Sequence, residues 1–164
     1  MSRAVRLLDL ATLALNVAGS LLIVAIMVLI GADVLGRAAL GQPVPGVPEM
    51  VTLSIVAIVF LQIPQAVRAG RLTRSDALLN AIGARRPALG AALEALFDAL
   101  AMAVMGVILW FTWPFFLRSW TSGDFIGAVG NFTAPTWPVK LIILIGSAML
   151  ILQFAARILR GARP

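Results

Sequence analysis

This 164-residue chain contains no histidine and no cysteine, so its seven acidic side chains are the main groups that could transfer protons or bind ions. Histidine is the usual haem ligand and proton shuttle near neutral pH, and cysteine is required for disulfides and thiolate metal sites. A bis-histidine membrane cytochrome and a quinone-linked disulfide oxidase are therefore excluded. The sequence also has no phosphate-binding glycine loop, clustered metal ligands or nucleophile beside a base, so it predicts no catalytic site, no metal site and no cofactor.

Asp33 and Arg37 lie four residues apart at the end of a long apolar segment. On a helix this spacing places both side chains on one face, and pairing limits the cost of a charge in hydrocarbon. A loop containing Pro45 and Gly46 follows, and Glu49 stands at the start of the next apolar segment, where an acid complements the helix dipole. That complementarity is the simplest explanation of Glu49. We further expect Asp33, Arg37 and Glu49 to organise this end of the protein around a defined turn.

Glu94 and Asp98 are also four residues apart, but like charges at this spacing repel. They are tolerable near lipid headgroups or opposite an arginine. The candidate arginines are Arg68, Arg85, Arg86 and Arg157. We expect a structural ion pair rather than a proton- or ion-carrying site, because neither acid reaches the middle of the membrane. On a neighbouring face, alanines repeat every four residues and form a stripe that suits close helix contact. The stripe consists of Ala91, Ala95, Ala99 and Ala103.

Four apolar segments must position these residues, and they cover about residues 10–35, 50–67, 89–117 and 139–156. Each is close to or above the roughly 18–20 apolar residues that cross about 30 Å of hydrocarbon as a helix. Helices satisfy their own backbone polar groups, which lipid cannot do. The composition agrees, with 61% hydrophobic and 12% charged residues. The chain is therefore predicted to be an all-α integral membrane protein, with one four-helix membrane domain over residues 1–164.

The 13 lysines and arginines are unevenly distributed along the chain. If the four helices alternate in direction, ten lie on the side of both termini and three, Arg37, Arg118 and Lys140, lie on the other. This bias places both termini in the cytoplasm of a bacterial inner membrane that the protein crosses several times. The net charge of +6 is thus a topology signal, and we expect no nucleic-acid partner. The first segment is about twice as long as a signal-peptide core and is expected to be retained.

The connections between the segments are less clearly specified. Residues 68–87 alternate leucine with charged side chains, which suits either a short interfacial helix or a solvated loop. Pro64 is expected to kink or end the second helix, and residues 118–134 are predicted to form a polar, glycine-rich loop. All the tryptophans fall on the side opposite the termini, where they predict an interfacial belt in contact with lipid or, alternatively, a protein contact. They are Trp110, Trp113, Trp120 and Trp137.

Taken in order, these features resemble the small membrane (Q) subunit of tripartite ATP-independent periplasmic (TRAP) transporters over nearly the whole chain. The residues that carry the resemblance are Asp33, Val34, Arg37, Pro45, Gly46, Glu49, Gly70, Pro135, Trp137, Pro138 and Gly146. In that family a histidine and then an aspartate would typically follow Gly70, whereas Arg71 and Asp76 follow it here. No family role is therefore carried over to this turn.

The resemblance implies an accessory scaffold subunit of a sodium-coupled secondary transporter for organic acids such as dicarboxylates. Its partners would be a large membrane (M) subunit, which holds the substrate and sodium sites, and a periplasmic solute-binding protein. Two other classes stay open. A self-contained four-helix transporter needs a membrane-embedded acid that residues 18–30 lack. A non-catalytic membrane anchor of an enzyme complex would not need a membrane-embedded acid.

Overall fold

Four long helices dominate the computed structural model, which describes residues 3–70 and 87–161. They are α1 (Arg3–Leu40), α2 (Val47–Arg68), α4 (Pro87–Ser122) and α5 (Trp137–Gly161). All four are long and apolar enough to cross a membrane, which confirms the predicted all-α, four-span fold. The interfacial helix considered between the second and third spans falls on residues 71–86, outside the described residues.

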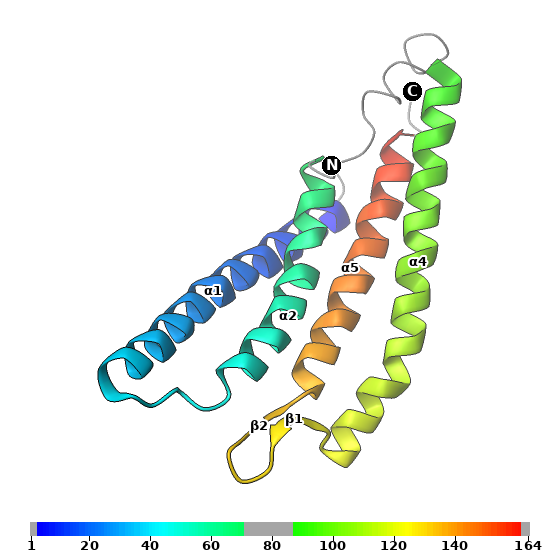
Figure 1. The fold of residues 1–164 in the computed structure, drawn as a ribbon. Helices are drawn as coiled ribbons and strands as arrows, with labels where there is room; N and C mark the ends of the chain where they lie inside the picture. Colours follow the sequence, from blue (N-terminus) through cyan, green and yellow to red (C-terminus); the bar gives the residue numbers. More distant parts are fainter. Residues whose placement is uncertain (1–2, 71–86, 162–164) are drawn as a thin grey trace.

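The helices form an open layer rather than a closed bundle (Figure 1). α2 packs between α1 and α5, α5 packs between α2 and α4, and α1 also reaches α5. α1 and α4 are therefore the outer helices, and α1 diverges from α2 towards their connecting loop. The start of α1 and the end of α5 lie together at what we call the terminal end. The opposite end, which carries residues 41–46 and 123–136, is called the hairpin end.

The connection between α4 and α5 is more ordered than the sequence suggested. α4 continues to Ser122, and two short strands follow, β1 (Phe125–Ala128) and β2 (Phe132–Pro135). The strands pair antiparallel, and their turn is closed by a 3.1 Å hydrogen bond from the Asn131 amide to the Ala128 carbonyl. The prediction of a loop over residues 118–134 was wrong, because glycines and polar residues masked the strand-forming Phe, Ile and Thr side chains.

α2 is likewise not ended by Pro64, and it continues to Arg68. Pro64 is buried among its neighbours. Inside a membrane protein, packing of this kind allows a helix to continue past the one backbone hydrogen bond that proline removes.

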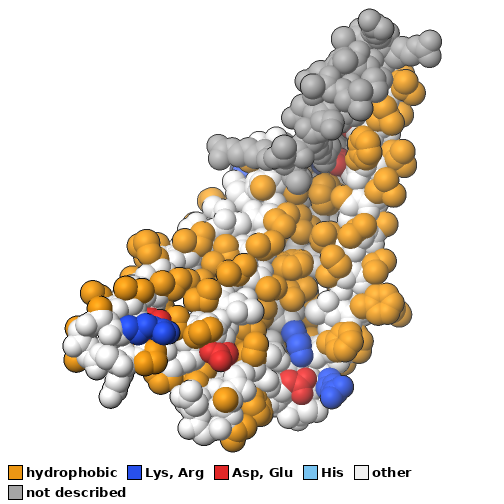
Figure 2. Space-filling view, in the orientation of Figure 1, with side chains coloured by type: hydrophobic (Ala, Val, Ile, Leu, Met, Phe, Trp, Pro, Cys, Tyr) orange, Lys and Arg blue, Asp and Glu red, His pale blue; other side chains and the backbone are white. Residues whose placement is uncertain are grey.

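Buried side chains are concentrated where α5 meets its two neighbours. Val67, Leu150 and Phe154 form a small cluster against which Met102 and Met105 of α4 pack. Most large apolar side chains of α1 and α4 are exposed instead. In the view of Figure 2, hydrophobic side chains cover the length of the layer, and the charged side chains in clear view gather at the hairpin end. A helix that is apolar all round is typical of a membrane span.

Candidate functional site

Asp33 joins the end of α1 to the loop that leads into α2. Its Oδ2 lies 2.9 Å from Nε of Arg37, one helical turn later, and its Oδ1 accepts a 2.8 Å hydrogen bond from the Val44 amide. Asp33 is buried, whereas the Arg37 side chain is mostly exposed at 57%. The structure thus brings together the acid and base that the spacing paired. It also adds a backbone contact that only the folded loop provides.

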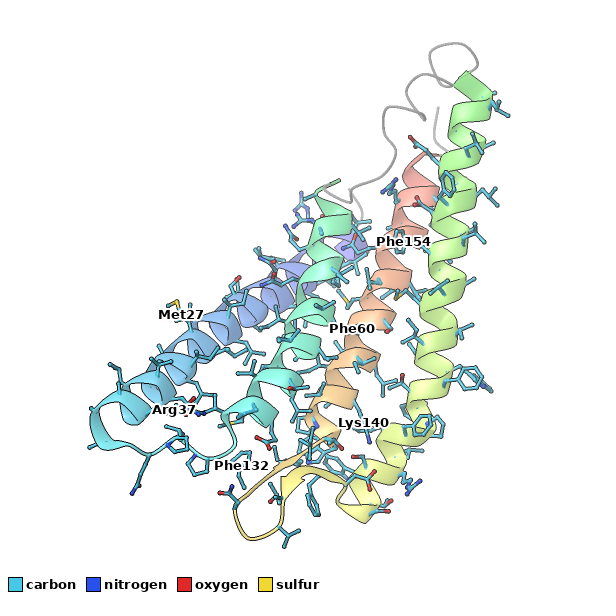
Figure 3. The ribbon with its side chains drawn as sticks, in the orientation of Figure 1. Met27, Arg37, Phe60, Phe132, Lys140 and Phe154 are labelled. Carbon is cyan, nitrogen blue, oxygen red and sulfur yellow. The ribbon has the colours of Figure 1, made fainter. Side chains whose placement is uncertain are left out.

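Gly46 is the N-cap residue of α2 and packs against the hairpin. Its φ of 82° lies in the left-handed region, and a Cβ at this position would overlap the ring of Phe132 (Figure 3). Pro45, beside it, is exposed. Glu49 lies in the first turn of α2, where it complements the helix dipole. Within the described residues Glu49 forms no ion pair, so the structure does not join it to Asp33 and Arg37.

Sequence reasoning missed a second set of polar contacts at the hairpin end. Lys140 Nζ lies 3.5 Å from Asp124 Oδ2, and the hydroxyls of Ser119 and Thr136 are 2.7 Å apart. The Thr136 amide and hydroxyl both donate to the Asp124 carbonyl, over 3.0 Å and 3.2 Å. These contacts clamp the two ends of the hairpin between α4 and α5. These four residues are not related by helical spacing. Their contacts could have been predicted only if the hairpin had first been recognised in the sequence.

At the terminal end, the two acids of α4 have different surroundings. Asp98 is buried, and its Oδ2 lies 3.2 Å from Nε of Arg157 on α5. Glu94 is exposed and forms no ion pair with the side chains that the structure describes, those of residues 5–70 and 88–159. Of the two acids, Arg157 therefore pairs with Asp98 and not with Glu94. Pairing with a base explains how the carboxylate of Asp98 is accommodated between two apolar helices.

Two further polar contacts at the terminal end were not predicted. Arg68 Nε lies 3.1 Å from Asp9 Oδ1, an electrostatic contact without hydrogen-bond alignment. Gln153 Nε2 donates a buried 2.7 Å hydrogen bond to Thr12 Oγ1. Together with the Asp98–Arg157 pair, these contacts connect α1 to α2, α1 to α5, and α4 to α5. The terminal end is thus a polar layer that ties the four helices together.

The alanine stripe of α4 faces away from the rest of the protein. Ala91, Ala95, Ala99 and Ala103 are all exposed. α4 instead packs against the cluster on α5 through Ala101, Met102 and Met105. The stripe is consequently available to lipid or to another membrane protein.

Three of the four tryptophans are exposed along the hairpin-end half of α4. Trp110, Trp113 and Trp120 are 76%, 53% and 59% exposed, as an interfacial belt requires. Trp137 starts α5 and packs edge-on against Trp120, with 4.7 Å between ring centroids. This contact adds an aromatic link to the polar contacts between the ends of α4 and α5.

The family model for the DctQ component of tripartite ATP-independent periplasmic transporters matches residues 26–164. Comparisons with curated proteins and with solved structures find no match. The family match includes Asp33, Arg37, the hairpin, all of α2, α4 and α5, and α1 from residue 26 onwards, and it agrees with the resemblance drawn from the sequence. Because it covers most of the chain, the protein belongs to the DctQ family, the small membrane subunits of TRAP transporters.

Proposed function

We propose that the protein braces the large membrane subunit of a TRAP transporter and helps a periplasmic solute-binding protein to dock. The observation that carries this proposal is the open layer. α1 and α4 expose most of their large apolar side chains, and each has helical neighbours of this chain on one side only. A four-helix carrier would enclose a path for its solute between the helices, whereas an open layer offers broad faces to a larger partner.

The distribution of arginines supports an orientation for the layer. Arg6, Arg68 and Arg157 lie at the terminal end, while Arg37, Arg118 and Lys140 lie towards the hairpin end; in the sequence, alternation of the helices assigns ten of the 13 basic residues to the side of the termini. By the positive-inside rule the terminal end is cytoplasmic and the hairpin end is periplasmic, in a bacterial inner membrane. The exposed tryptophans of α4 then sit near the periplasmic headgroups.

The hairpin end supplies the surface proposed for docking. Val129 at the hairpin tip is 82% exposed, and Arg37 and Arg118 also reach solvent. The hairpin is held by the Lys140–Asp124 and Ser119–Thr136 contacts, so it presents a defined shape to an incoming protein. The substrate class, carboxylate-bearing solutes moved with sodium, is proposed from the family and resides in the other subunits.

The test is purification of the tagged protein from membranes that also contain the other subunits of its transporter. We expect the large membrane subunit to be recovered with it, and we expect solute uptake into liposomes only when both are present. Uptake by this chain alone would favour a self-contained carrier. Recovery of a redox or hydrolytic enzyme in place of a permease would favour an enzyme anchor, and either result would overturn the proposal.

A further inference from the structure

A groove of about 530 Å³ runs along α2, beside Asn16 of α1. Its polar lining consists of Asn16 on α1 and Gln62 and Gln65 on α2, while Val59 and Ala66 contribute apolar walls. The groove therefore differs from the rest of the exposed surface of α1 and α2, which is largely apolar. The Gln65 amide oxygen accepts a 3.3 Å hydrogen bond from Arg68, so the amides left to explain are those of Asn16 and Gln62.

Asn16 and Gln62 lie at the same depth. Asn16 is seven residues from Asp9, and Gln62 is six residues from Arg68. The Asp9–Arg68 contact joins α1 to α2 at the terminal end. At 1.5 Å of rise per residue, both amides lie about 9–11 Å inward from that contact. With the ion pair at the level of the headgroups, both amides stand in hydrocarbon.

Neither amide is satisfied by the part of the chain that the structure describes. Asn16 and Gln62 make no side-chain hydrogen bond to residues 3–70 or 87–161. Gln62 is held beside α1 because its Cγ packs where a Cβ on Gly19 would stand. An amide without a partner in an apolar medium costs free energy, and an acyl chain offers no donor or acceptor.

Two hydroxyl side chains on the same helices differ from these amides, because each has a hydrogen-bond partner. Ser20 donates to the Asn16 carbonyl over 3.0 Å, and Thr52 donates to the Pro48 carbonyl over 2.8 Å. Each is exposed but is satisfied by its own helix backbone. Ser20 and Thr52 therefore need no partner, whereas Asn16 and Gln62 do.

We propose that the groove receives a transmembrane helix of the large membrane subunit, through a hydroxyl or amide side chain that hydrogen-bonds to Asn16 and Gln62. This inference rests on the proposed function, and it identifies the groove as the surface that contacts the large subunit. Small residues such as Ala66 and Ala69 let a second helix approach closely, and polar side chains join membrane helices. Because the polar side chains in the otherwise apolar lining of the groove are uncharged amides, the matching side chain is Ser, Thr, Asn or Gln rather than an acid or a base.

The absence of cysteine makes a direct test available, since one introduced cysteine is the only thiol in the chain. Val59→Cys and Ala66→Cys, labelled with a photo-crosslinker in membranes holding the complete transporter, should form an adduct with the large subunit. The matched control is Met27→Cys, since Met27 lies on α1 beyond the groove and points away from α2 (Figure 3). We expect at least about fivefold more adduct from the groove positions.

Adducts from Val59→Cys and Ala66→Cys no stronger than those from Met27→Cys would overturn the inference, provided that the complex itself is recovered. Crosslinks only to lipid or to a second copy of this chain would also overturn it. Failure of the unmodified protein to associate with the large subunit would instead refute the proposed function, and the inference with it.

Removal of the amides supplies an independent test. Asn16→Leu and Gln62→Leu should each lower recovery of the large subunit by about three- to tenfold, as expected for loss of an interhelical hydrogen bond. Ser20→Ala and Thr52→Val are the matched controls and should leave recovery unchanged. Since Gln62 also packs against Gly19, the thermal stability of each purified variant is measured as well. Unchanged recovery for stable Asn16→Leu and Gln62→Leu variants would contradict the proposal.

Discussion

Gln153 hydrogen-bonds to Thr12 across 141 positions of the chain, and this contact connects the last helix to the first. Both side chains are buried. The Thr12 hydroxyl accepts from Gln153 and also donates to the Leu8 carbonyl over 2.8 Å, so it has a second partner. Thr12 is the only described residue to which the Gln153 side chain hydrogen-bonds. Loss of the Thr12 hydroxyl would therefore leave the Gln153 side chain without its partner, whereas loss of Gln153 would leave Thr12 bonded to Leu8.

Thr12→Val is expected to destabilise the protein by about 1–3 kcal/mol, because it leaves the Gln153 amide buried without a partner. Gln153→Leu should cost about 0.6 kcal/mol, a typical value for a polar contact between membrane helices, since Thr12 keeps its bond to Leu8. Unfolding in mixed micelles, followed by tryptophan fluorescence, measures both. The double variant should resemble Gln153→Leu, and equal costs for the two single variants would contradict this asymmetry.

Arg157→Met should destabilise the protein by about 3 kcal/mol, because it removes a charged partner from the buried carboxylate of Asp98. Replacing both residues, Asp98→Leu with Arg157→Met, is expected to cost less than Arg157→Met alone. Glu94→Gln is the control on the same helix, and it should change the free energy of unfolding by less than about 0.5 kcal/mol because Glu94 is exposed. A double variant less stable than Arg157→Met would show that the pair is itself strongly stabilising.

Gly46→Ala should loosen the hairpin, because the new Cβ meets the Phe132 ring in addition to straining the backbone. Gly41→Ala is a matched control, since Gly41 also has a positive φ, 66°, but has open space around it. We expect the control to cost about 1–2 kcal/mol from backbone strain alone and Gly46→Ala to cost more. Amide hydrogen exchange in residues 125–135 should rise for Gly46→Ala only. Equal exchange in both variants would argue against the Phe132 contact.

Gly146→Ala should weaken the contact between α5 and α2. A Cβ on Gly146 would lie 2.5 Å from the Phe60 carbonyl oxygen and 2.8 Å from its Cβ, so the helices would have to separate. Overpacking of this kind costs about 1–3 kcal/mol. Gly106→Ala on α4 is the control, because nothing lies within 4 Å of its Cβ position. There alanine should be neutral or stabilising by up to about 1 kcal/mol, and destabilisation equal to that of Gly146→Ala would contradict the packing argument.

Arg37→Glu should lower both recovery of the large subunit and solute uptake by the complete transporter severalfold. The change places a second acid one turn from Asp33 and breaks the contact that supports the loop into α2. Arg118→Glu is the matched control for assembly, because Arg118 is an exposed arginine towards the same end with no ion pair in residues 3–70 and 87–161. Wild-type assembly and uptake in Arg37→Glu would remove Asp33 and Arg37 from the proposed functional residues.

Sequence spacing predicted those contacts of the site that lie within one helix. Asp33 and Arg37 could be paired from their spacing, because four residues make about one helical turn. Glu94 and Asp98 could be placed on one face of α4, but not distinguished, since nothing local shows that α5 covers only Asp98. The hairpin was missed because its strands are short and interrupted by Gly127, which weakens the alternation that identifies a strand.

The number of membrane helices and their approximate extents were determined by the sequence alone, because hydrocarbon requires long apolar segments that satisfy their own backbone. Their neighbours were decided only by the tertiary structure. An apolar helix face is equally acceptable to lipid and to another helix, so hydrophobic pattern does not show which faces meet. The contacts of Asp9 with Arg68 and of Thr12 with Gln153 depend on how the helices are rotated and offset against one another, which no spacing along a single helix records.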